Sequence, residues 1–373
     1  MEGPRYPAAR ARAALLEERF ARRAADAPGG SSTTPLPDAR AIEALIDAAF
    51  WASLLREEGY APEISLAYLP PEKAEHALRL AAPLPLDSRA LAKLAPAVER
   101  PGIHLGVWRE GEALVVWGTT RAIPTFSFVV EVLGPGLLVV KHRVRDDSVK
   151  FENVAVFEGD RVKLLSRQPP VRCDPPDLLC SFLAPDTASE VDSTAVLLRL
   201  AVSMRAHGRG GTLLVVPAGT EAWRESIERP IRYRVEPAFS ELGDALAREG
   251  GRTHAHEDVA RVVEALAGLT AVDGATLMTD RYELLAFGVK IGRADDRPRV
   301  ERVILSEPVE GDVPSVVSPL ELGGTRHLSA AQFVHDQRDG VALVASQDGR
   351  FTVFAWSPRE DMVHAHRVEI LLL

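Results

Sequence analysis

The sequence predicts a protein of two domains, in which an α/β domain with a mixed sheet flanked by helices follows an α+β domain with antiparallel strands. The length of 373 residues exceeds the roughly 100 to 200 residues of an ordinary single domain. Short β-branched runs separated by Gly-rich turns fill residues 103–165, whereas helices and strands alternate from about residue 194 onward. Proline-rich stretches lie between these two patterns, so we place the domain boundary near residues 168–192.

The N-terminal part begins with a predicted surface helix over residues 8–26, where Leu15, Leu16 and Phe20 form a thin apolar stripe. A segment rich in Gly, Ser, Thr and Pro follows and is typical of a linker. Apolar residues three and four positions apart then predict a second helix that begins at Asp38 and ends at Gly59. The resulting division of the chain is a helix and linker at 1–37, an α+β domain at 38–170, a connector at 171–193 and the α/β domain at 194–373.

The elements of the α/β domain follow from short apolar runs and amphipathic stretches that alternate along the chain. The predicted helices cover residues 194–207, 238–248, 256–267 and 330–336. The predicted strands cover residues 212–217, 274–279, 284–289, 300–305, 341–346 and 350–356.

Composition and charge narrow the classes of partner. The chain holds 44 Lys and Arg against 53 Asp and Glu, a net charge of -9, which disfavours nucleic-acid binding because a polyanion is repelled. A small phosphorylated ligand needs only one or two arginines and remains possible. With Cys173 and Cys180 as the two cysteines, and with neither a signal peptide nor a membrane span, we expect a cytoplasmic protein with reduced thiols that does not bind membrane.

The first segment with potential chemistry is Asp273-Gly274-Ala275, placed where a helix leads into an apolar strand. A carboxylate in that position can hold a metal ion, and the small residues after it leave room for a ligand. Taken alone, the same residues also fit a plain Asp-Gly turn that starts a strand.

The second segment is Gly323-Gly324-Thr325-Arg326-His327, which precedes a predicted helix. Glycines allow close backbone approach, Thr325 offers a hydroxyl and an N–H, and Arg326 offers a phosphate fork, so the composition fits a phosphate cradle. The alternative is a glycine-rich loop that caps a helix and exposes two basic residues. Ser346, between two predicted strands, would ordinarily belong to a hairpin turn.

In this order and spacing the motifs resemble the diadenylate cyclase (DAC) domain, whose hallmarks are a DGA motif and a downstream GTRHR-type motif. The resemblance covers about residues 194–357 and implies a DAC-type mixed sheet. It further implies a face-to-face homodimer or higher oligomer, in which each domain holds ATP or another nucleoside triphosphate and the two nucleotides are joined into cyclic di-AMP. Mg²⁺ or Mn²⁺ is the implied cofactor.

The resemblance also implies roles for the first motif. Asp273 would bind the metal and help to activate the attacking 3′-hydroxyl, and Gly274 and Ala275 would make room for the ribose. His327 would lie beside the metal and the phosphates as a second metal ligand and catalytic residue.

The remaining motif residues are implied to bind the nucleotide. Gly324, Thr325 and Arg326 would hold the triphosphate, and Ser346 would contact a phosphate. Leu328 departs from the family pattern, which has a second arginine there, and one charge-assisted contact of about 1.5–3 kcal/mol is thereby lost.

Two functions follow. The first is a nucleotidyltransferase that condenses two nucleoside triphosphates into cyclic di-AMP or a related cyclic or linear dinucleotide. The second is a degenerate DAC-like nucleotide sensor of a signalling or defence system, with an N-terminal extension of the sensor type (DACNV-like). Leu328 and the long segment between the motifs, which carries Arg293, Asp295, Asp296 and Arg297, motivate the second.

Histidines and tryptophans outside these motifs are expected to be structural. The pairs His254/His256 and His364/His366 have a spacing that could ligate zinc on a strand, but without further ligands they are expected to be solvated residues of loops or strand edges. Trp108 and Trp117 are expected in a core rather than on a base-stacking surface.

Overall fold

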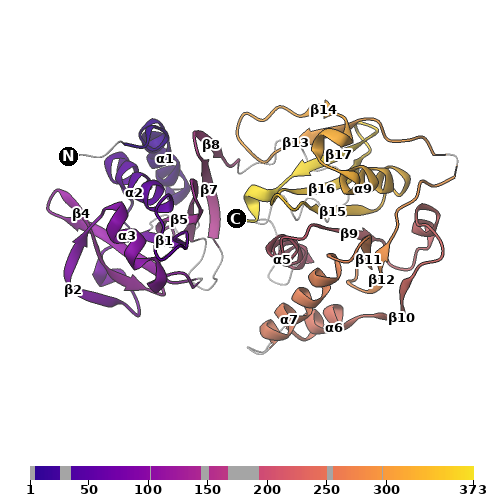
Figure 1. Ribbon diagram of the computed structural model, residues 1–373, viewed down its shortest axis with the longest axis horizontal. Coiled ribbons are helices and arrows are strands. Elements are labelled where there is room, and N and C mark those ends of the chain that lie inside the picture. Colours follow the sequence, from indigo (N-terminus) through magenta and orange to yellow (C-terminus); the bar gives the residue numbers. More distant parts are fainter. Residues whose placement is uncertain are drawn as a thin grey trace. The chain divides into compact units, whose positions relative to one another are not determined.

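The computed structural model describes residues 5–25, 35–100, 102–143, 151–166, 193–249, 255–295 and 297–373. The chain divides into one unit of Met1–Leu165 with Leu373 and a second unit of Ser166–Leu372, each with its own sheet (Figure 1). The connector predicted at 171–193 lies outside the described residues except for Ser193, and so do most of the predicted linker, Cys173, Cys180, His254 and Asp296.

The N-terminal unit is built on an eight-stranded sheet of order β2-β4-β3-β1-β5-β6-β7-β8. Only β1 and β3 pair in parallel within the described sheet, so the prediction of an α+β domain with antiparallel strands is confirmed. The strands are β1 (Ile64–Tyr68), β2 (Leu78–Pro85), β3 (His104–Glu110), β4 (Ala113–Thr120), β5 (Phe128–Gly134), β6 (Leu137–Arg143), β7 (Phe151–Glu158) and β8 (Arg161–Leu164).

Three helices of this unit are α1 (Pro7–Ala25), α2 (Ala39–Ser53) and α3 (Ser88–Leu94). Helix α2 packs on β5 and β6, and α1 packs on α2. Asp38 caps α2 by accepting a hydrogen bond from the N–H of Ala41 at 2.9 Å, as the sequence signal indicates. The predicted end at Gly59 is wrong, because the helix stops at Ser53 and Gly59, with φ +91°, lies in a turn closed between Glu57 and Tyr60.

The C-terminal unit contains a nine-stranded mixed sheet of order β10-β12-β11-β9-β15-β16-β17-β13-β14. The pairs β9/β11 and β13/β17 are parallel and the other pairs are antiparallel. The strands are β9 (Gly211–Val216), β10 (Tyr233–Phe239), β11 (Ala275–Thr279), β12 (Leu284–Val289), β13 (Val303–Ser306), β14 (Ser315–Val317), β15 (Val341–Ala345), β16 (Phe351–Ser357) and β17 (Met362–Arg367).

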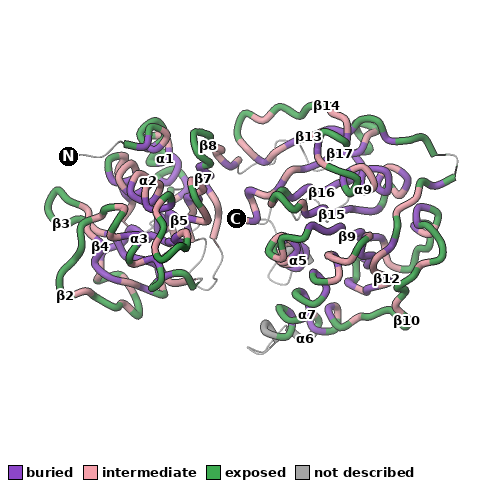
Figure 2. Tube along the Cα trace, in the orientation of Figure 1, coloured by how far each residue is buried: buried purple, intermediate pink, exposed green. Residues whose placement is uncertain are grey.

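Helices cover both faces of this sheet, which confirms the predicted fold class. On one face α5 (Ser193–Ala206), α6 (Glu241–Glu249) and α7 (Ala255–Leu269) share a core with Leu213 and Leu343. On the other face α9 (Thr325–Asp336), which follows the short α8 (Pro319–Leu322), shares a core with Leu214 and Ala342. The central strands β9, β15 and β16 are buried along their whole length (Figure 2), because alternate side chains serve both layers.

Several elements of the C-terminal unit differ from the prediction. Residues 238–239 belong to β10 and the helix begins only at Glu241, because Pro237 and the strand pairing with β12 extend the chain up to that point. Strands β10, β14 and β17 were not predicted at all. Strand β17 lies inside the sheet between β16 and β13, a position that the local pattern of residues 362–367 does not reveal.

The expectation that His364 and His366 are solvated is wrong. Both side chains are buried, their rings stack 3.9 Å apart, and both ring systems share the hydroxyl of Ser306, which lies 2.9 Å from His364 Nε2 and 3.1 Å from His366 Nδ1. Strand β13 covers the edge that would otherwise face water. Burial lowers the pKa of His366 well below its usual value, so the ring stays neutral.

The expectation that Trp108 and Trp117 pack in a core is confirmed. Trp117 is buried and its indole N–H donates to the carbonyl oxygen of Leu69 at 3.0 Å, while Trp108 packs partly buried against the same core. Within the described part of the chain, no helix is long and apolar enough to cross a membrane.

Candidate functional site

The eight residues singled out in the two motifs and the hairpin line one pocket of the C-terminal unit. Its volume is about 440 Å³, within the range of small-molecule sites, and its walls also include residues that the sequence analysis missed. The lining residues are Thr212, Glu228, Asp273, Gly274, Ala275, Val289, Lys290, Ile291, Gly324, Thr325, Arg326, His327, Ser329, Ala345 and Ser346.

Strand pairing explains why segments some 50 residues apart meet here. Strand β15 runs antiparallel to β9, so Ala345 at its end lies opposite Gly211 at the start of β9. Strand β12 runs antiparallel to β11, so Val289 lies opposite Ala275. Because β9 and β11 are parallel, their N-terminal ends lie at the same end of the sheet. Helix α9 also begins there.

The backbone at Gly274 requires glycine. Its φ is +120°, and a Cβ built there would lie 2.5 Å from the carbonyl carbon of Gly288 and 2.7 Å from the carbonyl oxygen of Val289. Gly274 therefore allows the chain to turn tightly against β12 and places Asp273 at the mouth of the pocket.

Asp273 is a solvent-facing carboxylate held by a lysine. Its side chain is 93% exposed, and Oδ2 accepts a hydrogen bond from Lys290 Nζ at 2.7 Å. This hydrogen bond and the charge of Lys290, with a smaller contribution from Arg326, lower the pKa of Asp273, so the carboxylate is ionised at neutral pH. Lys290 was missed because its position opposite Asp273 depends on the β11–β12 pairing, although a lysine directly after a predicted strand was a visible signal.

The first turn of α9 opens into the pocket. Gly324 is the N-cap and provides no side-chain cap, so the free N–H groups of this turn and the positive end of the helix dipole are available to a ligand. Arg326 is exposed in the same turn, and its Nη1 lies 3.2 Å from the position that a Cβ on Gly210 would occupy. The guanidinium thus lies close to Gly210, directly before β9.

His327 does not provide the positive charge that a phosphate cradle would require of it. Its side chain is buried, lies against Gly323 and meets the ring of Phe354 edge-on at 6.1 Å. Burial is the largest cause that lowers the pKa of His327 to about 4, so the imidazole is neutral at pH 7. Its Nε2 is a buried atom that has no hydrogen-bond partner among the residues that the structure describes, which leaves it able to accept a hydrogen bond or to bind a metal ion. The basic groups of this pocket are Lys290 and Arg326.

Ser346 lines the pocket, whereas Leu328 does not. Ser346 lies in the turn after β15, where its N–H donates to the carbonyl oxygen of Arg350 at 2.9 Å, and its side chain hydrogen-bonds Asp348. Leu328, the departure from the motif, does not line the pocket. Arg293 and Arg297 do not line it either, and the neighbouring Ala294 is tied to α9 by a hydrogen bond from its N–H to Asp336 at 3.0 Å.

The protein side chains described here would hold a metal ion only together with the phosphate oxygens of a bound nucleotide. Among the described residues, no three His, Cys, Asp or Glu side chains gather at a possible metal site. Mg²⁺ in nucleotide enzymes is commonly bound by one or two carboxylates together with phosphate oxygens, so the exposed Asp273 fits that type of site. His327 Nε2 would add a nitrogen ligand, which is not the type of donor that Mg²⁺ prefers.

Comparisons with known proteins bear on the N-terminal part. No curated protein matches the chain. A crystal structure described as a hypothetical membrane spanning protein from Bacillus cereus aligns with a TM-score of 0.27 and 14% identity, covering 47% of this chain and 63% of that one, and so low a score says nothing of fold or function. Residues 31–121 match a family model described as a probable sensor domain, DACNV. The N-terminal unit thus carries a segment similar to the sensor domain that is associated with diadenylate cyclases.

Proposed function

We propose that the pocket of the C-terminal unit binds a nucleoside triphosphate and that the protein is a DAC-type nucleotidyltransferase. The observation that carries the proposal is the convergence of Asp273-Gly274-Ala275 and Gly324-Thr325-Arg326-His327, far apart in the sequence, on one pocket of about 440 Å³. The match of residues 31–121 to DACNV supports it independently, because that domain is associated with diadenylate cyclases.

The triphosphate would lie against the first turn of α9. The uncapped N–H groups after Gly324 and the guanidinium of Arg326 would donate hydrogen bonds to phosphate oxygens, and the ammonium of Lys290 would neutralise further charge. Phosphoryl transfer relies mainly on such positioning and charge neutralisation. Lys290 would thereby add a cation to a pocket whose second motif has Leu328 where the family pattern has an arginine.

The reaction joins two nucleotides. The 3′-oxygen of one forms a bond to the α-phosphorus of the other, the α–β phosphoanhydride bond breaks, and pyrophosphate leaves. The ionised carboxylate of Asp273 would polarise the 3′-hydroxyl, whose proton passes to solvent. A bound Mg²⁺ or Mn²⁺ would supply neutralisation of the phosphate charge, with Asp273 and His327 as the protein groups able to hold it. Because the pocket has the size of a single-nucleotide site, the second nucleotide would come from another copy of the chain, facing the first.

The test is turnover by the full-length protein with each ribo- and deoxyribonucleoside triphosphate and Mg²⁺ or Mn²⁺, measured as pyrophosphate and dinucleotide. Asp273→Asn should abolish product while leaving nucleotide binding within a few-fold of wild type. Arg326→Gln should weaken nucleotide binding about tenfold, since one charge-assisted contact is lost. Arg261→Gln, which changes an exposed arginine of α7 that pairs with Asp258, is the matched control.

A second candidate function is nucleotide sensing without turnover. The observation that favours it is the Lys290–Asp273 ion pair, because the ammonium of Lys290 already binds the carboxylate that a catalytic metal would require. Saturable binding with no product from any nucleotide would decide for sensing. Recovery of product in Lys290→Gln would then indicate that the ion pair holds the enzyme inactive. Absence of both binding and product would refute both candidates.

A further inference from the structure

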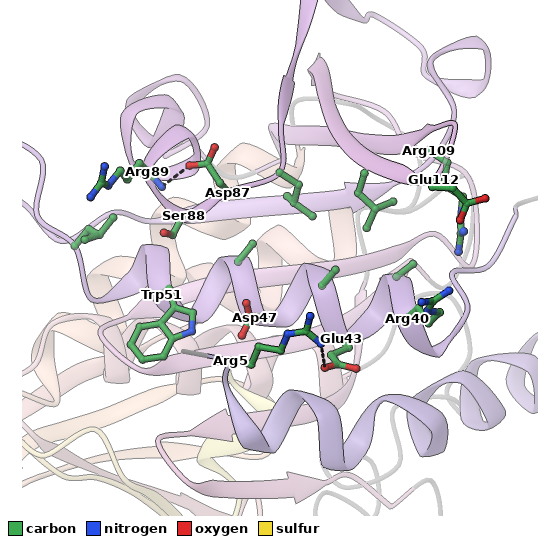
Figure 3. A pocket seen from close by; sticks show the side chains of 16 residues that line it. Arg5, Arg40, Glu43, Asp47, Trp51, Asp87, Ser88, Arg89, Arg109 and Glu112 are labelled. Atoms are coloured by element: carbon green, nitrogen blue, oxygen red, sulfur yellow. Dashed lines mark hydrogen bonds and ion pairs between the residues drawn. The ribbon is translucent and has the colours of Figure 1, made fainter. Parts of the chain in front are cut away.

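The N-terminal unit contains a second, larger cavity that the proposed nucleotide site does not involve. It is a groove of about 880 Å³ between α2 and the segment that joins β2 to α3, and β4 closes its far side (Figure 3). Ala41, Ala44 and Ala48 occupy successive turns of α2 along the groove, and their short side chains leave it hollow. Leu86 and Leu114 form the opposite apolar wall. All lining residues except Arg5 fall within residues 31–121.

Most of the carboxylates around the groove are already engaged by the protein. Glu43 pairs with Arg5 at 4.0 Å, and Asp47 accepts a hydrogen bond from the backbone N–H of Tyr6 at 2.6 Å. Asp87 caps α3 by accepting hydrogen bonds from the N–H groups of Arg89 and Ala90, both at 2.9 Å. These contacts fix the positions of the three carboxylates, and among the described residues only Glu43 of the three lies beside a cation.

The cations are only partly engaged. Arg109 pairs with Asp38 at 2.5 Å and donates to Tyr68 Oη at 3.2 Å. Within the described part of the chain, Arg40 and Arg89 form no ion pair within 4.0 Å. The carboxylate of Glu112 lies at the same end of the groove as Arg40 and balances it, whereas Arg89 lies at the other end (Figure 3).

Trp51 adds a polar group that lacks a partner. Its indole Nε1 is buried and finds no hydrogen-bond acceptor among the described residues, and a buried N–H without an acceptor is costly. Trp51 lies at the same end of the groove as Ser88 and Arg89 (Figure 3). One end of the groove thus combines an unpaired guanidinium, an unsatisfied indole N–H, a hydroxyl and an aromatic face.

We propose that this groove is a ligand-binding site for a small organic anion with a flat apolar ring system. The anionic group would bind to Arg89 and Ser88, and the indole N–H of Trp51 would donate to an acceptor on the ligand. The rings would lie along the alanines of α2, between them and Leu86 and Leu114, where burial of flat apolar surface is favourable.

The probe is 8-anilinonaphthalene-1-sulfonate, an aromatic anion, titrated into the full-length protein by calorimetry and by energy transfer from tryptophan. Ala44→Leu should fill the groove and remove one saturable binding site without lowering the melting temperature. Arg89→Gln should weaken that site about tenfold, as expected for loss of one charge-assisted contact. N-phenyl-1-naphthylamine, which has the same rings without the sulfonate, should bind Arg89→Gln and wild type equally.

Two controls separate this site from other binding. Arg121→Gln removes an exposed arginine of the same unit that does not line the groove, and Arg326→Gln alters only the nucleotide pocket; both should bind the probe as wild type does. The proposal is overturned if the probe does not saturate, if folded Ala44→Leu binds it unchanged, or if Arg89→Gln weakens it no more than Arg121→Gln. Because the readout is independent of nucleotide, failure here leaves the proposed function untouched.

Discussion

Replacing Gly274 with alanine tests whether the tight turn next to Asp273 requires a residue without a side chain. A residue with a side chain at a φ of +120° is strained by about 1–3 kcal/mol. The new Cβ would also lie 2.5 Å from the carbonyl carbon of Gly288, and such overpacking costs about 1–3 kcal/mol. The clashing atoms are backbone of the neighbouring chain segment, so they cannot move aside without shifting the β11–β12 pairing. Gly274→Ala should therefore destabilise the C-terminal unit by about 2–6 kcal/mol.

The assay is unfolding of the full-length protein by urea and by calorimetry, with hydrogen exchange of peptides covering residues 275–289 to locate the loss. Gly268→Ala is the matched control, because Gly268 is exposed in α7, six residues earlier, and a Cβ there would meet nothing within 4 Å. Alanine in that helix should stabilise the unit by about 0.5–1 kcal/mol. Equal stability of Gly274→Ala and wild type, or unchanged exchange of β11 and β12, would refute the reasoning.

Two further predictions concern the N-terminal unit. Burial, aided by the charges of Lys141 and Arg143, lowers the pKa of His104 to about 4, below its unfolded value of 6.5. The unfolded state therefore binds more protons between these values, so stability is fully present above pH 6.5 and falls by about 3 kcal/mol toward pH 4. His104→Gln should flatten the pH dependence of the urea midpoint, and an unchanged slope would contradict this assignment. Gly106→Ala should cost about 3 kcal/mol because its Cβ would overlap the ring of Trp117, whereas Gly134→Ala, with nothing within 4 Å of the new Cβ, should be nearly neutral in the same urea titration; equal midpoints for the two variants would contradict the predicted clash.

The elements near the site were largely predictable. The strand expected at residues 284–289 is observed as β12 with those bounds, and the apolar runs of β9 and β15 correctly indicated strands, which the structure shows to be buried on both faces. These strands can be predicted from the local sequence because a strand that helices cover on both faces is apolar along most of its length. The helix expected at residues 330–336 is part of α9, which begins earlier, at Thr325, because Gly324 ends the extended chain.

Positions that depend on a distant partner were not predictable. The local sequence predicts His364 and His366 at the edge of a sheet. They are buried because β13, some 60 positions earlier in the chain, pairs with their strand. Lys290 became a site residue only because β12 places it against Asp273. His327 is neutral because burial lowers its pKa to about 4, with Phe354 and Gly323 packed against its ring.

The sequence by itself determined the fold class, several strands of the C-terminal sheet, among them β9, β11, β12, β15 and β16, and the positions of the two motifs, because these depend on side-chain polarity and backbone freedom over a few neighbouring residues. Only the tertiary structure decided that the motifs line one pocket, that its cations are Lys290 and Arg326 rather than His327, and that a second groove lies along the alanines of α2. The physical reason is that burial and electrostatic contact are set by residues remote in the chain, which strand pairing and helix packing bring within a few ångströms of one another.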